Sequence, residues 1–246
     1  MTFPSPDPSS QAWPRRPARL GIPVVAALVD QIVGGELAPG ASLPTEPALS
    51  QAFGVSRVVI REAVKLLEEK GLARVRQGHG TTVTPREEWN LLDPVVLEAT
   101  IRHDDEMAIL DDLVDVRVAL ECDMVRLAAE RMTSDDLASL DRLLGELESE
   151  LTESERYQET DTRFHDLILR CSGNQLGRSI IRSIHPYARA STRYNPPADK
   201  EDIRQSHAGH VAIYEHLVRR DGDGASAAME EHIRGTWALR KQKRDL

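Results

Sequence analysis

The chain of 246 residues is long enough for two domains, each with its own hydrophobic core. Hydrophobic residues make up 40% and charged residues 29%, as in a globular protein, and no apolar run approaches the roughly 20 residues that cross a bilayer, which excludes a membrane protein. The net charge of −9 is uneven, because residues 1–86 carry ten Lys/Arg against seven Asp/Glu, whereas residues 87–246 carry 21 against 33. A mildly basic first part fits a protein that touches DNA at one end, although charge alone does not separate this from chance.

Residues 1–18 are rich in proline and serine and lack the apolar core of a signal peptide, so we expect a disordered tail. The two cysteines, Cys122 and Cys171, lie in apolar helical patterns and form no Cys-x-x-Cys motif. These features favour buried, reduced thiols in a cytoplasmic protein.

The spacing of apolar residues over residues 19–84 predicts three helices followed by a β-hairpin. Thr45 is a suitable N-cap for the second helix, and Pro47 falls in its first turn, where the missing N–H costs little. Gly54 supplies a left-handed stop, and Ser56 caps the third helix. The expected elements are helices at 24–33, 46–53 and 57–70 and strands at 72–76 and 81–84.

The third helix carries a basic strip, because Arg57, Arg61 and Lys65 stand four residues apart on one face. The guanidinium group of arginine donates two parallel hydrogen bonds that match guanine edges and phosphates. A basic strip alone is usually a solvated face, and a glycine hairpin alone is usually a turn. A short helix, a glycine turn and a basic helix in this order are typical of a winged helix-turn-helix that enters the major groove.

The stretch 28–83 resembles the winged helix of the GntR family of bacterial transcription regulators. The motifs that carry the resemblance are Gly40-x-x-Leu43-Pro44-x-Glu46, Gly54-Val55-Ser56-Arg57-x-x-Ile60-Arg61-Glu62-Ala63, Gly71-Leu72 and Gly78-x-Gly80-Thr81. The resemblance implies DNA-facing residues at the cap of the second helix, the start of the third helix and the wing, namely Thr45, Ser56, Arg57, Val58, Val59, Arg61, Gln77, Gly78 and His79. Pro47 and Ala48 stand where the family usually has Arg and Glu, so one DNA contact is expected to be lost.

Residues 85–93 are predicted to form a linker anchored by Trp89. Residues 94–246 contain almost no strand pattern, and their helical segments are separated by turn sequences such as Ser172-Gly-Asn174. The expected helices cover 94–103, 107–132, 134–151, 155–171, 175–190, 201–220 and 223–243. The predicted fold class is therefore mainly α, with an N-terminal winged helix-turn-helix domain and a C-terminal all-α bundle for effector binding and dimerisation.

The second part also contains a candidate metal-binding set. Asp161 and His165 lie four residues apart on one helix face, and His210 and His232 lie 22 residues apart on two consecutive helices. Three imidazoles and a carboxylate from facing helices would hold a divalent transition metal and leave coordination positions open. From spacing alone, however, a histidine near an apolar face is more often a satisfied core or surface residue.

Residues 94–246 are similar to the C-terminal ligand-sensing (FCD) domain of the FadR branch of the GntR family. Asp161-x-x-Phe164-His165, Ser172-Gly173-Asn174, and His210 with Met229-x-x-His232 occur in the family's order. The resemblance implies that Asp161, His165, His210 and His232 are the metal ligands, for zinc or, as alternatives, nickel or manganese. The remaining histidines of this part match nothing and are expected at the surface or between helices, at positions 103, 185, 207 and 216.

A bound cation with open positions favours an anionic effector, such as a small carboxylate or sugar acid that chelates through carboxylate and hydroxyl oxygens. Arg117 occupies a position that could fix such an acid, or it forms an ordinary helix pair with Glu121. The linker sequence WNLLDP resembles that of repressors of galactonate and gluconate operons over six residues.

We therefore expect a homodimeric regulator, a repressor by family habit, that reads a palindromic double-stranded DNA operator and does not bind membranes. One alternative is a metal-dependent enzyme, which would turn over a substrate but leaves the DNA module without a role. The other is a DNA-binding protein without ligand control, whose DNA affinity would not respond to metabolites.

Overall fold

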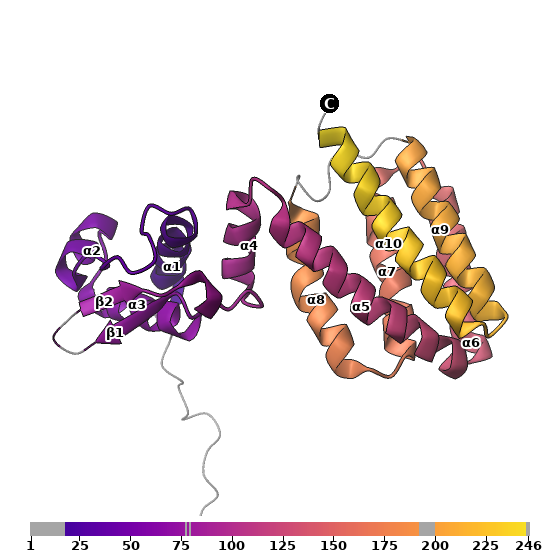
Figure 1. The fold of residues 1–246 in the computed structure, drawn as a ribbon, viewed down its shortest axis with the longest axis horizontal. Coiled ribbons are helices and arrows are strands. Elements are labelled where there is room, and N and C mark those ends of the chain that lie inside the picture. The colour runs from indigo at the N-terminus through magenta and orange to yellow at the C-terminus, as the bar shows by residue number, and fades with distance from the viewer. Residues whose placement is uncertain (1–17, 77, 79, 192–199, 245–246) are drawn as a thin grey trace, which may run out of the picture. The chain divides into compact units, whose positions relative to one another are not determined.

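The structure is a computed structural model that describes residues 18–76, 78, 80–191 and 200–244. It divides into two compact units, residues 1–90 and 91–246, which are described separately below (Figure 1). Helices dominate the described residues of both units, and the one sheet among them is a two-stranded hairpin, which confirms the predicted mainly α fold class. Within these residues, no helix combines the length and the apolar character needed to cross a bilayer.

The first unit contains α1 (Ala18–Val33), α2 (Glu46–Phe53), α3 (Arg57–Glu69), β1 (Ala73–Arg76) and β2 (Gly80–Val83). Its core is built from apolar residues of α1 and α3 that are at most 7% exposed: Leu28, Val29, Ile32, Ile60, Val64 and Leu67. The strands pair antiparallel from Ala73 opposite Val83 to Arg76 opposite Gly80, and an isolated bridge joins Ser42 to Thr82. The hairpin is thereby attached to the chain that leads into α2.

The boundaries of the first two elements follow from local chemistry. Thr45 accepts the Ala48 N–H at 3.4 Å as the N-cap of α2, and Gly54 ends that helix with φ 64°. Helix α1 begins at Ala18, earlier than the predicted Val24, and runs through Pro23. The prediction followed the apolar spacing that begins after Pro23, and because proline has no N–H, the helix lacks one backbone hydrogen bond at this residue.

Residues 85–90 pack on the first unit. The Trp89 side chain is 8% exposed, its indole N–H donates to the Thr84 carbonyl at 3.3 Å, and the Asn90 N–H donates to the Lys70 carbonyl at 3.0 Å. Gly71 makes this close approach feasible, because a Cβ there would collide with the Glu88 carbonyl.

The second unit is a helical bundle. Its helices are α4 (Pro94–His103), α5 (Ala108–Arg131), α6 (Ser134–Ser149), α7 (Ser154–Cys171), α8 (Gln175–Ala190), α9 (Lys200–Val218) and α10 (Gly222–Arg244). Helix α5 packs against α7 and α10, and α9 lies beside α10 (Figure 1). One apolar core joins these helices through fully buried residues such as Leu110, Leu140, Phe164, Ile213 and Met229.

Candidate metal centre and DNA-reading surface

Three helices bring four metal-ligating side chains to one place in the bundle. Helix α7 supplies Asp161 and His165, α9 supplies His210, and α10 supplies His232. One ligand atom from each of these residues lies within 4.8 Å of the others. The three imidazoles are at most 8% exposed, so water is largely excluded from them. The structure thus brings together all four residues that the sequence singled out for a metal.

Regular packing explains why these residues meet. Asp161 and His165 share a face of α7 because they are four residues apart. Helices α9 and α10 follow each other around a short turn, and each contributes a fully buried core residue, Ile213 and Met229. His210 and His232 lie side by side, with ring centroids 4.3 Å apart. A Cβ on Gly209 would lie 2.5 Å from His232 Nδ1, so only glycine lets the two helix backbones and the ring approach this closely.

The outer ring nitrogens are held by other polar groups. His165 Nδ1 lies 3.0 Å from Glu121 Oε2, and His210 Nδ1 lies 3.2 Å from the Tyr157 hydroxyl. A carboxylate on one nitrogen of a metal-binding imidazole fixes the tautomer and turns the lone pair of the other nitrogen toward the ion. Glu121 is in turn paired with Arg117, whose Nε lies 2.6 Å from its Oε1. Arg117 thus forms the helix pair with Glu121, buried on both sides, and it also lines the cavity beside Asp161 and His165.

Two pairs of ligand atoms on the inner side of the cluster have the spacing of ligands on one metal ion. His165 Nε2 and His232 Nε2 lie 3.2 Å apart, and His210 Nε2 lies 3.1 Å from Asp161 Oδ1. Ligands at the zinc–nitrogen distance of about 2.0–2.1 Å stand about 3.0–3.4 Å from each other. His210 Nε2 is buried and has no hydrogen-bond partner among the described residues, which is the state expected of an atom that serves a bound ion. Nitrogen and carboxylate donors without thiolate suit a divalent transition metal.

The electrostatics favour the metal-binding protonation states. Burial raises the pKa of the Asp161 carboxyl, but the close polar contact with His210 and the charge of Arg189 outweigh it and hold that pKa well below its usual range. Burial, followed by the neighbouring His210 and His165, holds the pKa of His232 well below its ordinary value. At neutral pH the carboxylate is therefore ionised and the His232 imidazole is neutral, as coordination requires.

Sequence reasoning missed several residues around this cluster. Arg189 Nη1 lies 2.8 Å from Asp161 Oδ2, and the half-buried His185 shares a cavity wall with Asp161 and His165. Both lie on α8, and no spacing rule links that helix to α7 or α10. His185 had been assigned to the surface or to helix packing. Of these surrounding residues, only Glu121 could have been found from the sequence, because it follows Arg117 by four residues on an otherwise apolar helix face.

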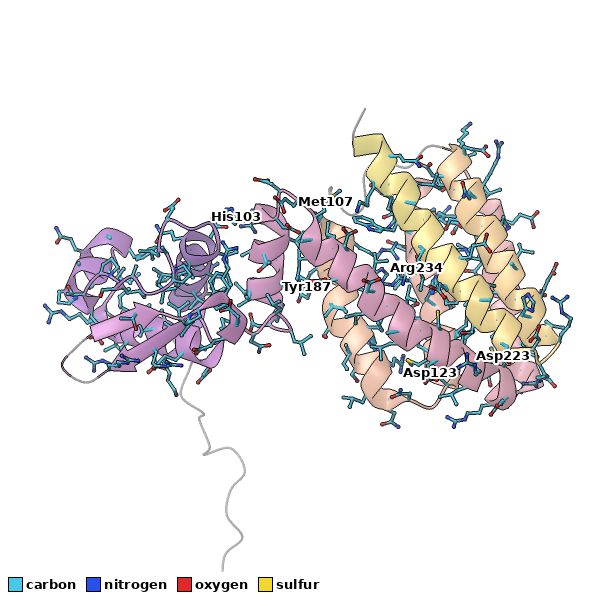
Figure 2. All side chains as sticks on the ribbon, viewed as in Figure 1. His103, Met107, Asp123, Tyr187, Asp223 and Arg234 are labelled. Carbon is cyan, nitrogen blue, oxygen red and sulfur yellow. The ribbon has the colours of Figure 1, made fainter. Side chains whose placement is uncertain are left out.

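The other histidines do not belong to the four-residue cluster. His103 is exposed at the end of α4 (Figure 2), and His216 Nδ1 lies 2.7 Å from Asp221 Oδ2 at the turn into α10. His207 is half-buried on α9, and burial lowers its pKa.

In the first unit, the residues expected to face DNA lie at the start of α3 and around it. Arg57 and Val58 are exposed, the latter by 65%, while Val59 is half-buried. Ser56 caps α3 by accepting the Val59 N–H at 3.4 Å. Thr45 is exposed as well, although its hydroxyl is engaged as the cap of α2.

Arg61 is not isolated on this surface. Its guanidinium group forms two hydrogen bonds to the Glu46 carboxylate, at 3.1 and 3.3 Å, which tie α3 to the start of α2. In the wing, Gly78 has φ 79°, a conformation that favours glycine, whereas Gln77 and His79 lie outside the described residues.

A helix-turn-helix with an exposed basic helix and a hairpin wing, followed by a helical bundle with a buried polar cluster, defines an effector-responsive DNA-binding protein. Residues 23–83 match the gntR family of bacterial regulatory proteins, and residues 112–235 match the FCD domain. The chain therefore belongs to the GntR family, in the branch that carries an FCD domain.

The chain is similar to several regulators. It is 32% identical to the galactonate operon transcriptional repressor of Escherichia coli K12, over 83% of this chain and 90% of that protein. It is 29% identical to the regulator LutR of Bacillus subtilis, over 82% and 92% of the two chains, and 27% identical to the repressor NanR of Cronobacter sakazakii, over 85% and 82%. The solved structure of Lar, which controls the Listeria monocytogenes agr system, matches with a TM-score of 0.60 at 20% identity over 93% and 99% of the two chains, and this supports the fold.

The protein is an effector-responsive transcription regulator that binds DNA, as the family match and the named relatives show. The family and the named relatives are transcription regulators and not enzymes, so the alternative of a metal-dependent catalyst is set aside. Regulators of this family bind DNA operators and usually act as dimers.

Proposed function

We propose that the chain is a repressor of a catabolic operon, and that a sugar acid or related small carboxylate, bound at a metal in the FCD domain, releases it from DNA. The observation that carries the proposal is the convergence of Asp161, His165, His210 and His232 on one buried point of the FCD domain. The similarity to a galactonate operon repressor supports a sugar acid as the effector.

The four residues hold a divalent transition metal, zinc by its preference for histidine, with nickel and manganese as alternatives. When bound, the ion supplies open coordination positions for a carboxylate and a neighbouring hydroxyl oxygen. Glu121 and Tyr157 orient two of the imidazoles, and Arg189 holds the second oxygen of Asp161. Arg117 contributes to this site by keeping Glu121 ionised beside His165.

Residues 19–84 form the DNA-binding domain, residues 85–93 the linker, and residues 94–246 the effector-binding and dimerisation domain. The DNA contacts come from the set predicted above, namely Thr45, Ser56, Arg57, Val58, Val59, Arg61, Gln77, Gly78 and His79. Two copies of α3 in a homodimer read a palindromic operator in successive major grooves of chromosomal DNA in the cytoplasm.

The effector acts through its differential affinity for two arrangements of the dimer. Binding at the metal shifts α7, α9 and α10 relative to one another and alters the separation of the two DNA-binding domains. A ligand with equal affinity for both arrangements would release no DNA, however tightly it bound.

The test is a thermal-shift screen of the purified protein against sugar acids, hydroxy acids and dicarboxylates, run metal-loaded and after chelation. A ligand that binds only the folded protein raises the melting midpoint as its concentration exceeds its Kd. We expect a sugar acid to give a shift that disappears on chelation and to release operator DNA in a gel-shift assay. A shift that persists after chelation would place the effector away from Asp161, and no shift from any acid in the screen would contradict an acid-responsive regulator.

A further inference from the structure

Several cavities adjoin the metal-ligand cluster, and their sizes differ widely. The cavity lined by Asp161, His165 and His232 has a volume of about 20 Å³, and the one lined by Asp161, Tyr157 and Arg189 has about 50 Å³. Since a cavity that holds one water has a volume of about 10–15 Å³, these two spaces hold only a few waters. Neither accommodates the whole of a six-carbon acid.

Two larger cavities also touch a metal ligand. One lies along α9 and α10 beside His232, measures about 280 Å³, and is lined mainly by small residues, with Glu231 as its charged side chain besides the histidine. The other lies between α7 and α8, measures about 340 Å³, and reaches His165, Glu121 and Arg117. A cavity of this size falls in the range of small-molecule sites. The former has Glu231 and no lysine or arginine in its lining, which disfavours an acid, whereas the carboxylates that line the latter, Glu121 and Asp166, are paired with arginines.

The α7–α8 cavity lies next to the small space at the candidate metal ligands. Arg117, His165 and His185 line both cavities, so an elongated molecule that reaches from the cluster into the larger cavity would pass these three side chains. Burial, then the nearby Arg117 charge, holds the pKa of His185 well below its ordinary value. The imidazole is neutral at physiological pH and suits hydroxyl groups, for which it both donates and accepts hydrogen bonds.

The α7–α8 cavity is lined by an arginine, Arg182, which precedes His185 by three residues. Arg182 lies on the same face of α8, is exposed, and makes no hydrogen bond or ion pair with any described residue. The neighbouring arginines differ from it, because Arg163 is paired with Glu146 at 2.7 Å and Arg178 with Asp166 at 2.7 Å. Arg182 therefore presents its donors to the cavity without first having to break a pair.

We propose that the α7–α8 cavity receives the hydroxylated chain of a long sugar acid whose acid end lies at the metal cluster, and that Arg182 binds the far end of that chain. This inference rests on the proposed function and adds the length of the effector to it. On this inference, an acid of six carbons is expected to reach Arg182, whereas an acid of three carbons is expected to end before it.

The test compares Arg182→Gln with the wild type by titration calorimetry on the metal-loaded protein, with galactonate as the long probe and glycerate as the short one. A charge-assisted hydrogen bond is lost with the long acid, so its Kd is expected to rise about tenfold to a hundredfold. The Kd of glycerate and the metal affinity are expected to stay unchanged. Arg182→Lys, which keeps the charge without the fork, should give an intermediate galactonate Kd.

Arg170→Gln is the matched control, because Arg170 lies on α7, is paired with Asp136 and does not line the cavity. It removes the same charge and should leave both Kd values unchanged. An unaltered galactonate Kd in Arg182→Gln, or an equal loss in Arg170→Gln, would overturn the assignment while leaving the proposed function intact. A wild-type protein that binds no sugar acid of any length would instead refute the proposed function and this inference with it.

Discussion

The DNA-reading surface and the metal-ligand cluster place their functional residues in opposite environments. At the start of α3, Arg57, Val58 and Arg61 are exposed and come from a single short stretch of chain. In the bundle, Asp161, His165, His210 and His232 are largely buried and come from three helices. An exposed surface can change its contacts at little cost to folding, whereas each polar group of the buried cluster depends on a partner. Substitutions should therefore act on affinity in the first region and on both stability and affinity in the second.

The largest effect on stability is expected from Arg117→Ala. The Arg117–Glu121 pair is at most 9% exposed on either side, and removing Arg117 leaves a buried carboxylate whose remaining hydrogen-bond partner among the described residues is His165. Breaking such a pair costs about 3–5 kcal/mol of unfolding free energy, which denaturant titration would measure. A change of only a few tenths of a kcal/mol would mean that the pair is as solvated as those on the surface. Arg102→Ala, at an exposed pair with Glu98, is the control.

His210→Ala tests the cluster itself. Removing one of four ligands should weaken metal binding more than a hundredfold, since loss of a residue that only supports a ligand already costs about 10–100-fold. The operator affinity of the effector-free protein should remain, because the substitution lies in the second unit. Competition with a chromophoric chelator measures the first quantity and a gel shift the second. Retention of wild-type metal affinity would remove His210 from the metal site.

Arg61→Ala probes the exposed region, and Glu46→Gln separates its two roles. Loss of an arginine contact to a base or phosphate should weaken operator binding by about 1–3 kcal/mol, without any change in metal affinity. Glu46→Gln removes the ion pair but keeps the guanidinium, so operator affinity should be kept or improved. If both variants lose affinity equally, Arg61 acts by holding α2 on α3 rather than by touching DNA. Fluorescence anisotropy with labelled operator supplies both values.

Gly209→Ala should improve the helix and damage the site at once. Alanine is a better helix former than glycine by about 1 kcal/mol, but its Cβ would lie 2.5 Å from His232 Nδ1 and must displace that ring. We expect metal affinity to fall about tenfold. Gly235→Ala on α10 is the matched control, since nothing lies within 4 Å of its Cβ and it should only raise the melting temperature. Equal metal affinity in the two variants would show that the His232 ring has room to move.

The smallest effect concerns acid stability through Asp111, whose carboxylate accepts the Trp237 indole N–H at 2.7 Å and lies 2.9 Å from Lys241 Nζ. Partial burial raises the pKa of Asp111, but these two partners lower it further, so the folded pKa lies below the unfolded value of about 3.9. The stabilisation is present above that unfolded value and is lost as pH falls through the folded pKa. Because the pair is nearly half exposed, Asp111→Asn should cost under about 1 kcal/mol at pH 7, and this cost should shrink as the pH falls below the unfolded pKa. A loss that persists at pH 2 would assign it to packing.

The sequence predicted most helices of the bundle to within a residue or two, because their breaks carry strong turn and capping signals such as Thr133 and Ser172-Gly-Asn174. The prediction from sequence was less accurate where tertiary packing, and not the local sequence, decides the structure. The start of α1 was placed after Pro23, and the packing of residues 85–90 on the first unit has no local signature beyond Trp89. Neither feature can be predicted from the spacing of apolar residues.

The amino-acid sequence by itself determined the DNA-reading module and the identity of the four candidate ligands. Both are encoded by residues at fixed short spacings or in a family order, so no long-range contact is needed to find them. The sequence also placed Arg117 and Glu121 four residues apart, and hence within reach of each other.

Only the tertiary structure decided which other side chains surround those ligands. The packing of α8 on α7 brings Arg189 to Asp161, and the packing of α5 on α7 buries Glu121 beside His165. The packing of α8 on α7 also leaves a cavity between these helices, and Arg182, which forms no ion pair with a described residue, lies on its wall. Contacts between residues 28 or more positions apart depend on helix crossing and side-chain packing, which hydrophobic periodicity does not specify.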